Sequence, residues 1–205
     1  MNEFDIKAAG WDQNQMHWDR SDTIANEIIK RIPLKKKMTA LEYGAGTGIT
    51  SFLLKDYLKE ITLMDNSSEM IKVMDEKIKT TKVINLKTLN FDLEHNDYTA
   101  EKFDLIFTQM VLHHVANIEA IIKRFGTLLN KGGYLAIADL YPEDGSFHGA
   151  GFNGHLGFNP DILAKIIRKH NFQTVSQSTC FTIKKKISDN ETKYFDLFLL
   201  ISEKI

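Results

Sequence analysis

The chain has 205 residues, of which 43% are hydrophobic and 26% are charged. This length suits one domain with a single substantial core, and a net charge of −1 with this hydrophobic fraction excludes a disordered chain. Because 26 basic side chains balance 27 acidic ones, the charge disfavours binding to nucleic acid or to a membrane surface. The single cysteine, Cys180, excludes an internal disulfide framework and a multi-cysteine metal site.

The start of the chain and its apolar runs bear on its location. Residues 1–7 are charged and lack the apolar stretch of a signal peptide. No apolar run approaches the roughly 18 residues that a membrane span needs. We therefore expect a cytoplasmic protein without a membrane span, and no pattern in the sequence decides its oligomeric state.

The predicted elements alternate through most of the chain. Isoleucines at helical spacing predict a first helix over residues 20–31, which ends before Pro33. Short apolar runs then alternate with helical patterns. The predicted strands cover 39–43, 61–65, 83–90, 103–108 and 134–139, and the predicted helices cover 49–58, 68–80 and 118–129. This alternation predicts βαβ units and a parallel sheet with helices on both faces.

The last third of the chain departs from this alternation. Asn159 followed by Pro160 and Asp161 is typical of a helix start, and the helix is predicted to run to about His170. Two strand-like stretches follow, over 172–185 and 192–202, with only a short loop between them. Because such a loop cannot hold a crossover helix, we expect these strands to be antiparallel neighbours.

A glycine-rich turn follows the first predicted strand. Gly44, Gly46 and Gly48 lie where an open parallel sheet binds ligands, at the carboxyl end of a strand. The nicotinamide fingerprint G-x-G-x-x-G is absent because position 49 is Ile, and no Gly-Lys-Ser/Thr follows as in a phosphate-binding loop. The alternative interpretation is a tight strand-to-helix turn that requires small residues.

Asp65 ends the next predicted strand. An ionised carboxylate only accepts hydrogen bonds, so it can take them from both hydroxyls of a ribose. In the alternative interpretation Asp65 assists a helix cap, since Asn66 and Glu69 resemble a capping box. The position beside the glycine-rich turn favours the ribose interpretation.

Five ordered motifs resemble those of the class I S-adenosylmethionine-dependent methyltransferases. They cover 42–48, 65–67, 91–93, 103–107 with 111–115, and 129–133. The similarity is closest to the small-molecule group that includes the quinone-biosynthesis methyltransferases, and it extends to residues 4–12. It implies an α/β fold: a Rossmann-like seven-stranded, mostly parallel sheet with helices on both faces and an antiparallel C-terminal hairpin strand.

The resemblance also implies how S-adenosylmethionine binds as the cofactor. The glycine-rich backbone contacts its methionine part, Asp65 its ribose and Asp92 its adenine amino group. Glu42 stands where the family commonly has Asp, and it supports the loop or reaches the amino group of the cofactor. The implied cofactor-binding residues are Trp11, Glu42, Gly44, Ala45, Gly46, Gly48, Asp65, Asn66, Phe91, Asp92, Leu93, Gln109 and Met110.

The seven histidines raise the question of a metal site and of a general base. Adjacent side chains such as His113 and His114 diverge on a regular element, and no H-x-x-x-H pattern occurs, so we expect no metal. His114, His148 and His155 are the candidate general bases for an acceptor that arrives protonated. The basic runs 35–37 and 184–186 are interpreted as solvated surface, the second on an edge strand.

We therefore predict one methyltransferase domain over 1–205 that transfers a methyl group from S-adenosylmethionine to a small-molecule acceptor. Its parts are an N-terminal helical lid (1–37), a cofactor-binding core (38–140), a glycine- and aromatic-rich acceptor-side loop (141–158), and a C-terminal helix and hairpin (159–205). Two alternatives remain open: a protein that binds the cofactor or S-adenosylhomocysteine without catalysis, and a nicotinamide-dependent oxidoreductase.

Overall fold

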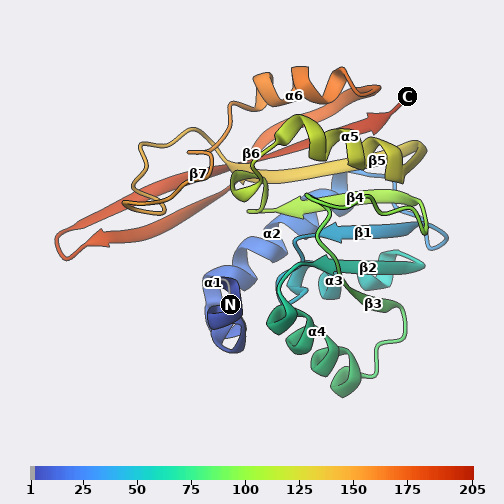
Figure 1. The fold of residues 1–205 in the computed structure, drawn as a ribbon, viewed down its shortest axis with the longest axis horizontal. Helices are drawn as coiled ribbons and strands as arrows, with labels where there is room; N and C mark the ends of the chain where they lie inside the picture. The colour runs from blue at the N-terminus through green and yellow to red at the C-terminus, as the bar shows by residue number, and fades with distance from the viewer. Residues whose placement is uncertain (1–2) are drawn as a thin grey trace.

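One mixed sheet organises the protein. The computed structural model describes residues 3–205, and within them the sheet has seven strands in the order β3-β2-β1-β4-β5-β7-β6 (Figure 1). The strands are β1 (Thr39–Tyr43), β2 (Glu60–Asp65), β3 (Leu86–Asn90), β4 (Phe103–Gln109), β5 (Leu129–Leu140), β6 (Phe172–Ser188) and β7 (Glu191–Lys204). Strands β1 to β5 pair in parallel, and β7 runs antiparallel to both β5 and β6. The predicted fold class is confirmed.

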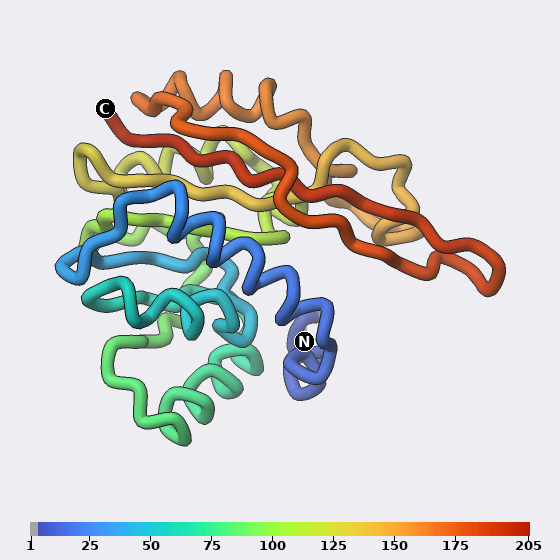
Figure 2. Tube along the Cα trace, turned by 180° about the vertical axis from the view of Figure 1, so that it is seen from behind, coloured from blue at the N-terminus to red at the C-terminus, as the bar shows by residue number. Residues whose placement is uncertain are grey.

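Helices cover both faces of the sheet (Figure 2). The helices α2 (Gln15–Arg31), α3 (Ile49–Leu54) and α4 (Ser68–Thr81) pack on one face, and α5 (Ile118–Leu128) and α6 (Pro160–Arg168) pack on the other. Neighbouring strand residues alternate between these layers: Ala40 and Leu105 belong to the core under α2, whereas Leu41 and Ile106 belong to the core under α5. All four are fully buried, as expected for parallel strands covered on both sides.

The chain enters the fold through two short helical segments and one long helix. These are α1 (Glu3–Lys7), the 3₁₀ turn η1 (Ala8–Gln13) and α2, which begins five residues before the predicted start of the first helix. The side chain of Asn14 accepts a hydrogen bond from the Met16 amide at 3.1 Å and so caps α2. The prediction missed this first part because its apolar spacing is weak.

Several element boundaries differ from the predicted ones. Helix α3 ends at Leu54 and continues only as the 3₁₀ turn η2 (Lys55–Tyr57), and β3 begins at Leu86 instead of residue 83. The capping box at Asn66, which belonged to the alternative interpretation of Asp65, does not form: Ser67 caps α4, and its hydroxyl accepts from the Met70 amide at 3.2 Å. The predicted cap of α6 is confirmed, since the side chain of Asn159 accepts from the Asp161 amide at 2.9 Å.

The C-terminal hairpin is confirmed and extends beyond the sheet. β7 pairs with β5 only from Tyr134↔Glu203 to Leu140↔Leu197, whereas its pairing with β6 continues to Ser188↔Glu191. The free end of the hairpin therefore forms a two-stranded arm that projects from the body (Figure 1). Within residues 3–205, no helix has the length and apolar character required to cross a membrane.

Candidate functional site

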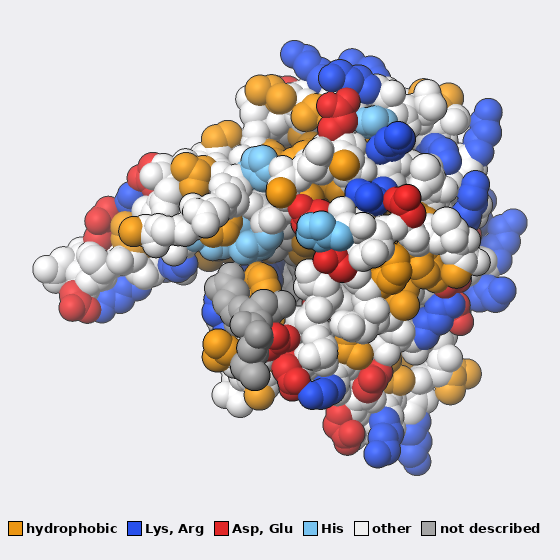
Figure 3. Space-filling model, viewed as in Figure 1, with side chains coloured by type: hydrophobic (Ala, Val, Ile, Leu, Met, Phe, Trp, Pro, Cys, Tyr) orange, Lys and Arg blue, Asp and Glu red, His pale blue; other side chains and the backbone are white. Residues whose placement is uncertain are grey.

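A cavity of about 890 Å³ opens at the carboxyl ends of β1, β2 and β4. The N-terminal segment and the base of the hairpin arm also line it, and Figure 3 shows histidine and hydrophobic side chains gathered near this base. Its wall contains the predicted cofactor-binding residues Trp11, Gly44, Ala45, Gly46, Asp65, Asn66, Phe91, Asp92, Leu93, Gln109 and Met110. Glu42 and Gly48 are the two members of the predicted set that do not line it.

The glycine-rich turn needs its glycines for two different reasons. Gly44 has a φ of 67°, and a Cβ placed there would lie 2.4 Å from Cγ2 of Val111. Gly46 has a φ of 56°, but a Cβ placed there would meet no atom closer than Nε1 of Trp11, at 4.0 Å. Packing therefore excludes a side chain at Gly44, whereas the backbone of Gly46 is exposed to whatever fills the cavity.

Asp65 joins the glycine-rich turn to the start of α4. One carboxylate oxygen accepts from the Gly46 amide and the other from the Ser67 amide, both at 2.8 Å. Burial raises the pKa of Asp65 above its ordinary value, although these hydrogen bonds act in the opposite direction. Each oxygen keeps a second acceptor position, so the carboxylate can shape the turn and still accept from two ligand hydroxyls.

Glu42 supports the turn from beneath. Its side chain is buried and accepts from the amide of Ser51 at 3.2 Å and from its hydroxyl at 2.5 Å, which ties β1 to the first turn of α3. Burial raises the pKa of Glu42 to about 7, against the lowering effect of the Ser51 and Thr50 hydrogen bonds. Of the two roles predicted for Glu42, this geometry fits support of the loop.

The turn after β3 supplies the cavity wall beyond Asp65. The Phe91 amide donates to the Asp65 carbonyl oxygen at 3.0 Å, which continues the β2–β3 ladder past the end of the strand. One oxygen of Asp92 accepts from the Glu94 amide at 3.0 Å, and the other lies 2.8 Å from Nδ1 of His95. Asp92 thus closes a turn at the rim of the cavity, and Leu93 beside it is buried.

Gln109 and Met110 shape the opposite wall. The Gln109 side-chain amide donates to the hydroxyls of Ser21 at 2.8 Å and Thr50 at 2.5 Å, so it links β4 to α2 and α3. Met110 has a φ of 57°, which is uncommon for a residue with a side chain and turns the chain sharply out of β4. This turn leads into the 3₁₀ turn η3 (Leu112–His114), which carries two histidines.

The N-terminal segment is fastened across the cavity by acidic side chains. Asp12 accepts from the Thr47 hydroxyl at 2.5 Å and from Nζ of Lys77 at 2.7 Å, and Lys77 also donates to the Thr47 carbonyl at 2.8 Å. In the preceding helix, Asp5 accepts from the Ser67 hydroxyl at 2.6 Å. These bonds hold Trp11 against the mouth of the glycine-rich turn.

Two of the three predicted general-base histidines face the cavity. His114 and His148 line it, together with His113, and the three rings lie close together. His155 is not part of the wall, because its Nε2 donates to the Val115 carbonyl oxygen at 3.0 Å. The expectation that the rings of His113 and His114 diverge is wrong: their centroids lie 4.2 Å apart, since η3 is an irregular turn.

The acceptor-side loop packs against the hairpin arm. Nζ of Lys185 donates to the Phe147 carbonyl oxygen and lies 4.6 Å from the centroid of the Phe147 ring. Nζ of Lys193 lies 2.6 Å from Asp144. Residues 184–186 line the cavity, but Lys184 and Lys186 remain exposed and only Lys185 is half-buried. The interpretation of this basic run as solvated surface therefore holds for two of its three residues, and its place on the edge strand β6 is confirmed.

Arg20 is a site residue that the sequence analysis missed. It lines the cavity from α2 with only 6% of its surface exposed, and its Nε has no hydrogen-bond partner within residues 3–205. Burial lowers its pKa to about 10, with Asp139 acting in the opposite direction, so the guanidinium stays charged at neutral pH. The predicted helix over residues 20–31 contains several polar residues, and no local pattern in the sequence distinguishes Arg20 from the others as a buried residue.

Comparison with known proteins supports one family. A family model described as "Methyltransferase domain" matches residues 34–196, which include β1 to β6 and the start of β7. An uncharacterized methyltransferase of Schizosaccharomyces pombe is 26% identical over 175 residues, which cover 82% of this chain. The chain spans 58% of the length of that relative.

Solved structures share the fold across their length. A chain from the complex of the Haloferax volcanii Trm112 methyltransferase activator superposes with a TM-score of 0.77 at 17% identity, covering 98% of both chains. The N-methyltransferase NodS of Bradyrhizobium japonicum, solved with S-adenosylhomocysteine, superposes with a TM-score of 0.68 at 18% identity. That match covers 91% of this chain and 86% of NodS. At these identities the similarity is one of fold.

Proposed function

Because the chain belongs to the class I S-adenosylmethionine-dependent methyltransferases, we propose that it methylates a small-molecule acceptor. A nucleophilic atom of the acceptor attacks the methyl carbon in line with the carbon–sulfur bond. That bond breaks, its electron pair stays on sulfur, and S-adenosylhomocysteine leaves. Since the sulfonium is already activated, the protein contributes mainly alignment, for which effective molarities reach about 10⁵–10⁸ M in well-oriented systems.

The observation that carries this proposal is the position of the Asp65 carboxylate between the glycine-rich turn and the start of α4. Its carboxylate bonds the Gly46 amide and the Ser67 amide, so the diol-binding group and the exposed backbone stand side by side. A nucleoside can then bind Asp65 through its ribose while its thioether tail lies along the turn. Phe91 and Leu93 supply apolar wall next to Asp65, and Asp92 supplies an acceptor, where the adenine would lie.

Arg20 is proposed to bind the carboxylate in the methionine part of the cofactor. A buried guanidinium whose Nε lacks a partner is costly, and a carboxylate relieves that cost through charge-assisted hydrogen bonds. Arg20 and the glycine-rich turn line the same cavity, whose acidic lining residues within the described chain are Asp65, Asp92 and Glu94. The cofactor would thus span from Asp92 through Asp65 to Arg20.

For the acceptor we propose a planar, largely apolar molecule, as the similarity to the quinone-biosynthesis group suggests. Phe4, Trp11, Phe147 and the rings of His114 and His148 provide flat surfaces on the cavity wall. His114 or His148 would accept a proton from an acceptor hydroxyl, amine or thiol that arrives protonated. His155 is withdrawn from this role because it faces away from the cavity.

Of the two alternatives, non-catalytic binding of the cofactor is retained because it requires the same cavity. The oxidoreductase is overturned by the family match and by the hairpin, in which β7 runs antiparallel where a second βαβ half would stand. Turnover against a panel of hydroxylated aromatic acceptors separates an enzyme from a binding protein: methylated product establishes the enzyme.

Calorimetry tests the position of the cofactor. We expect S-adenosylhomocysteine to bind, NAD not to bind, and the Asp65→Ala variant to lose about tenfold or more in affinity, because hydrogen bonds to a charged group contribute about 1.5–3 kcal/mol. Asp75→Ala is the matched control, since Asp75 lies on α4 outside the cavity. Undiminished affinity in Asp65→Ala places the nucleoside elsewhere.

A further inference from the structure

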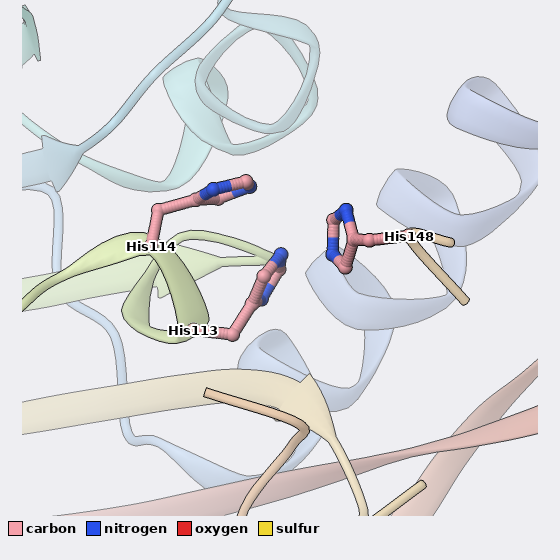
Figure 4. Close-up of side chains that lie close together, drawn as sticks. All are labelled: His113, His114 and His148. Atoms are coloured by element: carbon pink, nitrogen blue, oxygen red, sulfur yellow. The ribbon is translucent and has the colours of Figure 1, made fainter. Parts of the chain in front are cut away.

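Three imidazoles converge on one side of the cavity. His113 and His114 come from η3, and His148 comes from the loop after β5, so the cluster joins segments 34 or more positions apart in the chain. One ring nitrogen of each residue lies within 4.8 Å of those of the other two. Figure 4 shows the three rings turned toward a common space.

His113 is oriented by a buried carboxylate. Its Nδ1 lies 2.6 Å from Oδ1 of Asp139, and both side chains are almost fully buried. Asp139 also accepts from the His113 amide at 3.3 Å and from the Leu140 amide at 2.7 Å, so the carboxylate itself is held in place. Donation from Nδ1 of His113 to Asp139 directs Nε2 away from the carboxylate, as in carboxylate–histidine–metal arrangements.

The other two rings are held by aromatic contacts. The His148 ring stacks on Phe152 with centroids 3.8 Å apart and an interplanar angle of 12°. The His114 ring meets the edge of Phe4 at 5.2 Å. These contacts limit ring rotation on two sides of the cluster while leaving its third side open to the cavity that both histidines line.

We propose that His113, His114 and His148 bind a divalent transition-metal ion of the zinc type. Three neutral imidazoles with an open fourth position are a ligand set that Zn²⁺, Ni²⁺ and Co²⁺ accept in proteins. A tetrahedral ion with metal–nitrogen distances of about 2.0–2.1 Å sets its ligands roughly 3.3 Å apart. Metal binding would therefore draw the three ring nitrogens closer than the observed separations of up to 4.8 Å, by small adjustments of His114 and His148 within their aromatic contacts.

The open position faces the acceptor side of the cavity. The metal would there take an oxygen, nitrogen or sulfur atom of the acceptor, and a hydroxyl bound to it would release its proton more readily. This second statement rests on the proposed function, because it assumes that an acceptor occupies the cavity. Metal binding itself does not depend on that assumption.

Titration with Co²⁺ and with Zn²⁺ against a chromophoric chelator tests the site in the full chain. We expect one equivalent to bind, with the visible absorption of four-coordinate Co²⁺, and His148→Ala and His113→Ala to weaken binding by about tenfold or more. His170→Ala is the control, because His170 lies outside the cavity near the end of α6. Absence of binding to the wild-type chain, or equal binding in the cluster variants, overturns the proposal.

The variant Asp139→Asn provides a second readout that leaves all three ligands in place. A carboxylate that orients a metal-bound imidazole typically accounts for about 10–100-fold in affinity, so we expect a loss of that size. Binding of S-adenosylhomocysteine, measured without metal, reports separately on the fold and on the proposed function. If the wild-type chain does not bind S-adenosylhomocysteine, the proposed function is contradicted. If Asp139→Asn and wild type bind the metal equally well, the role of Asp139 is contradicted, and with it the metal site.

Discussion

Lys77 and Asp12 form an ion pair of 2.7 Å that joins α4 to the N-terminal segment, 65 positions earlier in the chain. Lys77 also donates to the Thr47 carbonyl at 2.8 Å, so one ammonium group fastens both the segment and the glycine-rich turn. The two side chains are 22% and 29% exposed. The pair therefore stabilises the packing of the N-terminal segment against the glycine-rich turn and α4, not a single helix.

Replacing Lys77 by methionine is expected to lower the affinity for S-adenosylhomocysteine by about two- to fivefold, since a partly exposed ion pair contributes about 1 kcal/mol or less. Methionine keeps the apolar stem but also removes the ammonium that lies 5.0 Å from the Phe52 ring centroid and 5.6 Å from that of Trp18. Calorimetry measures the change. Lys72→Met, which removes an exposed pair with Glu69 on the same helix, is the control and should bind like wild type. An equal loss of affinity in both variants would contradict the role of Lys77 in holding the N-terminal segment.

Arg20→Met should weaken cofactor binding and at the same time leave the ligand-free protein as stable or more stable. Among the described residues Nε of Arg20 has no hydrogen-bond partner, and burying such a guanidinium costs free energy that an apolar side chain of similar length removes. Its proposed bonds to the cofactor carboxylate contribute about 1.5–3 kcal/mol, or roughly 10–100-fold in affinity. Thermal unfolding with and without S-adenosylhomocysteine measures both effects, and Lys30→Met on the same helix is the control.

Unchanged cofactor affinity in Arg20→Met would remove Arg20 from the cofactor site. A loss confined to the KM of the acceptor would instead assign the guanidinium to an anionic acceptor. A clear fall in the stability of the ligand-free variant would contradict the conclusion that burying the Arg20 guanidinium costs free energy.

Glu42 is expected to make the stability of the fold depend on pH. Its pKa rises from 4.5 to about 7 on folding because the side chain is buried. Between these values the folded chain keeps a proton that the unfolded chain releases, so the free energy of unfolding falls as the pH rises from about 4.5 to 7. The difference corresponds to about 3 kcal/mol.

Glu42→Gln removes the titration but keeps an oxygen that accepts from Ser51. Its free energy of unfolding should therefore match wild type near pH 4.5 and exceed it above pH 7. Urea denaturation at pH 5 and pH 8 measures the free energy of unfolding of both proteins. Glu69→Gln, at the exposed start of α4, should follow the wild-type curve; parallel curves for Glu42→Gln and wild type would show that Glu42 is already ionised in the folded state.

Gly44 and Val111 form a steric pair that a double-mutant cycle can isolate. Gly44→Ala places a methyl group 2.4 Å from Cγ2 of Val111 at a φ of 67°, so we expect a loss of about 2–5 kcal/mol from strain and overpacking. Adding Val111→Ala removes the clash but not the backbone strain. The double variant should recover about 1–3 kcal/mol relative to additivity, and full additivity would contradict the contact.

The sequence by itself determined the elements whose cause is local. Alternating apolar runs predicted β1 at its observed bounds, the short loop before β7 predicted an antiparallel hairpin, and Asn159 before Pro160 predicted the start of α6. The glycine-rich turn and Asp65 were also recognisable, because a ligand site at strand ends needs particular residues at fixed spacing. In each case the determining residues lie within a few positions of one another.

Tertiary structure decided which distant side chains share the cavity. Arg20 and Lys185 reach it from elements that the sheet brings together, and the Asp12–Lys77 pair fastens the N-terminal segment beside it. No spacing along the chain marks these residues. The adjacent rings of His113 and His114 meet because Met110 turns the chain with a positive φ and η3 departs from regular geometry. Local sequence preferences predict single helices and strands. Contacts between distant residues depend instead on how these elements pack, and packing is decided by all core side chains together.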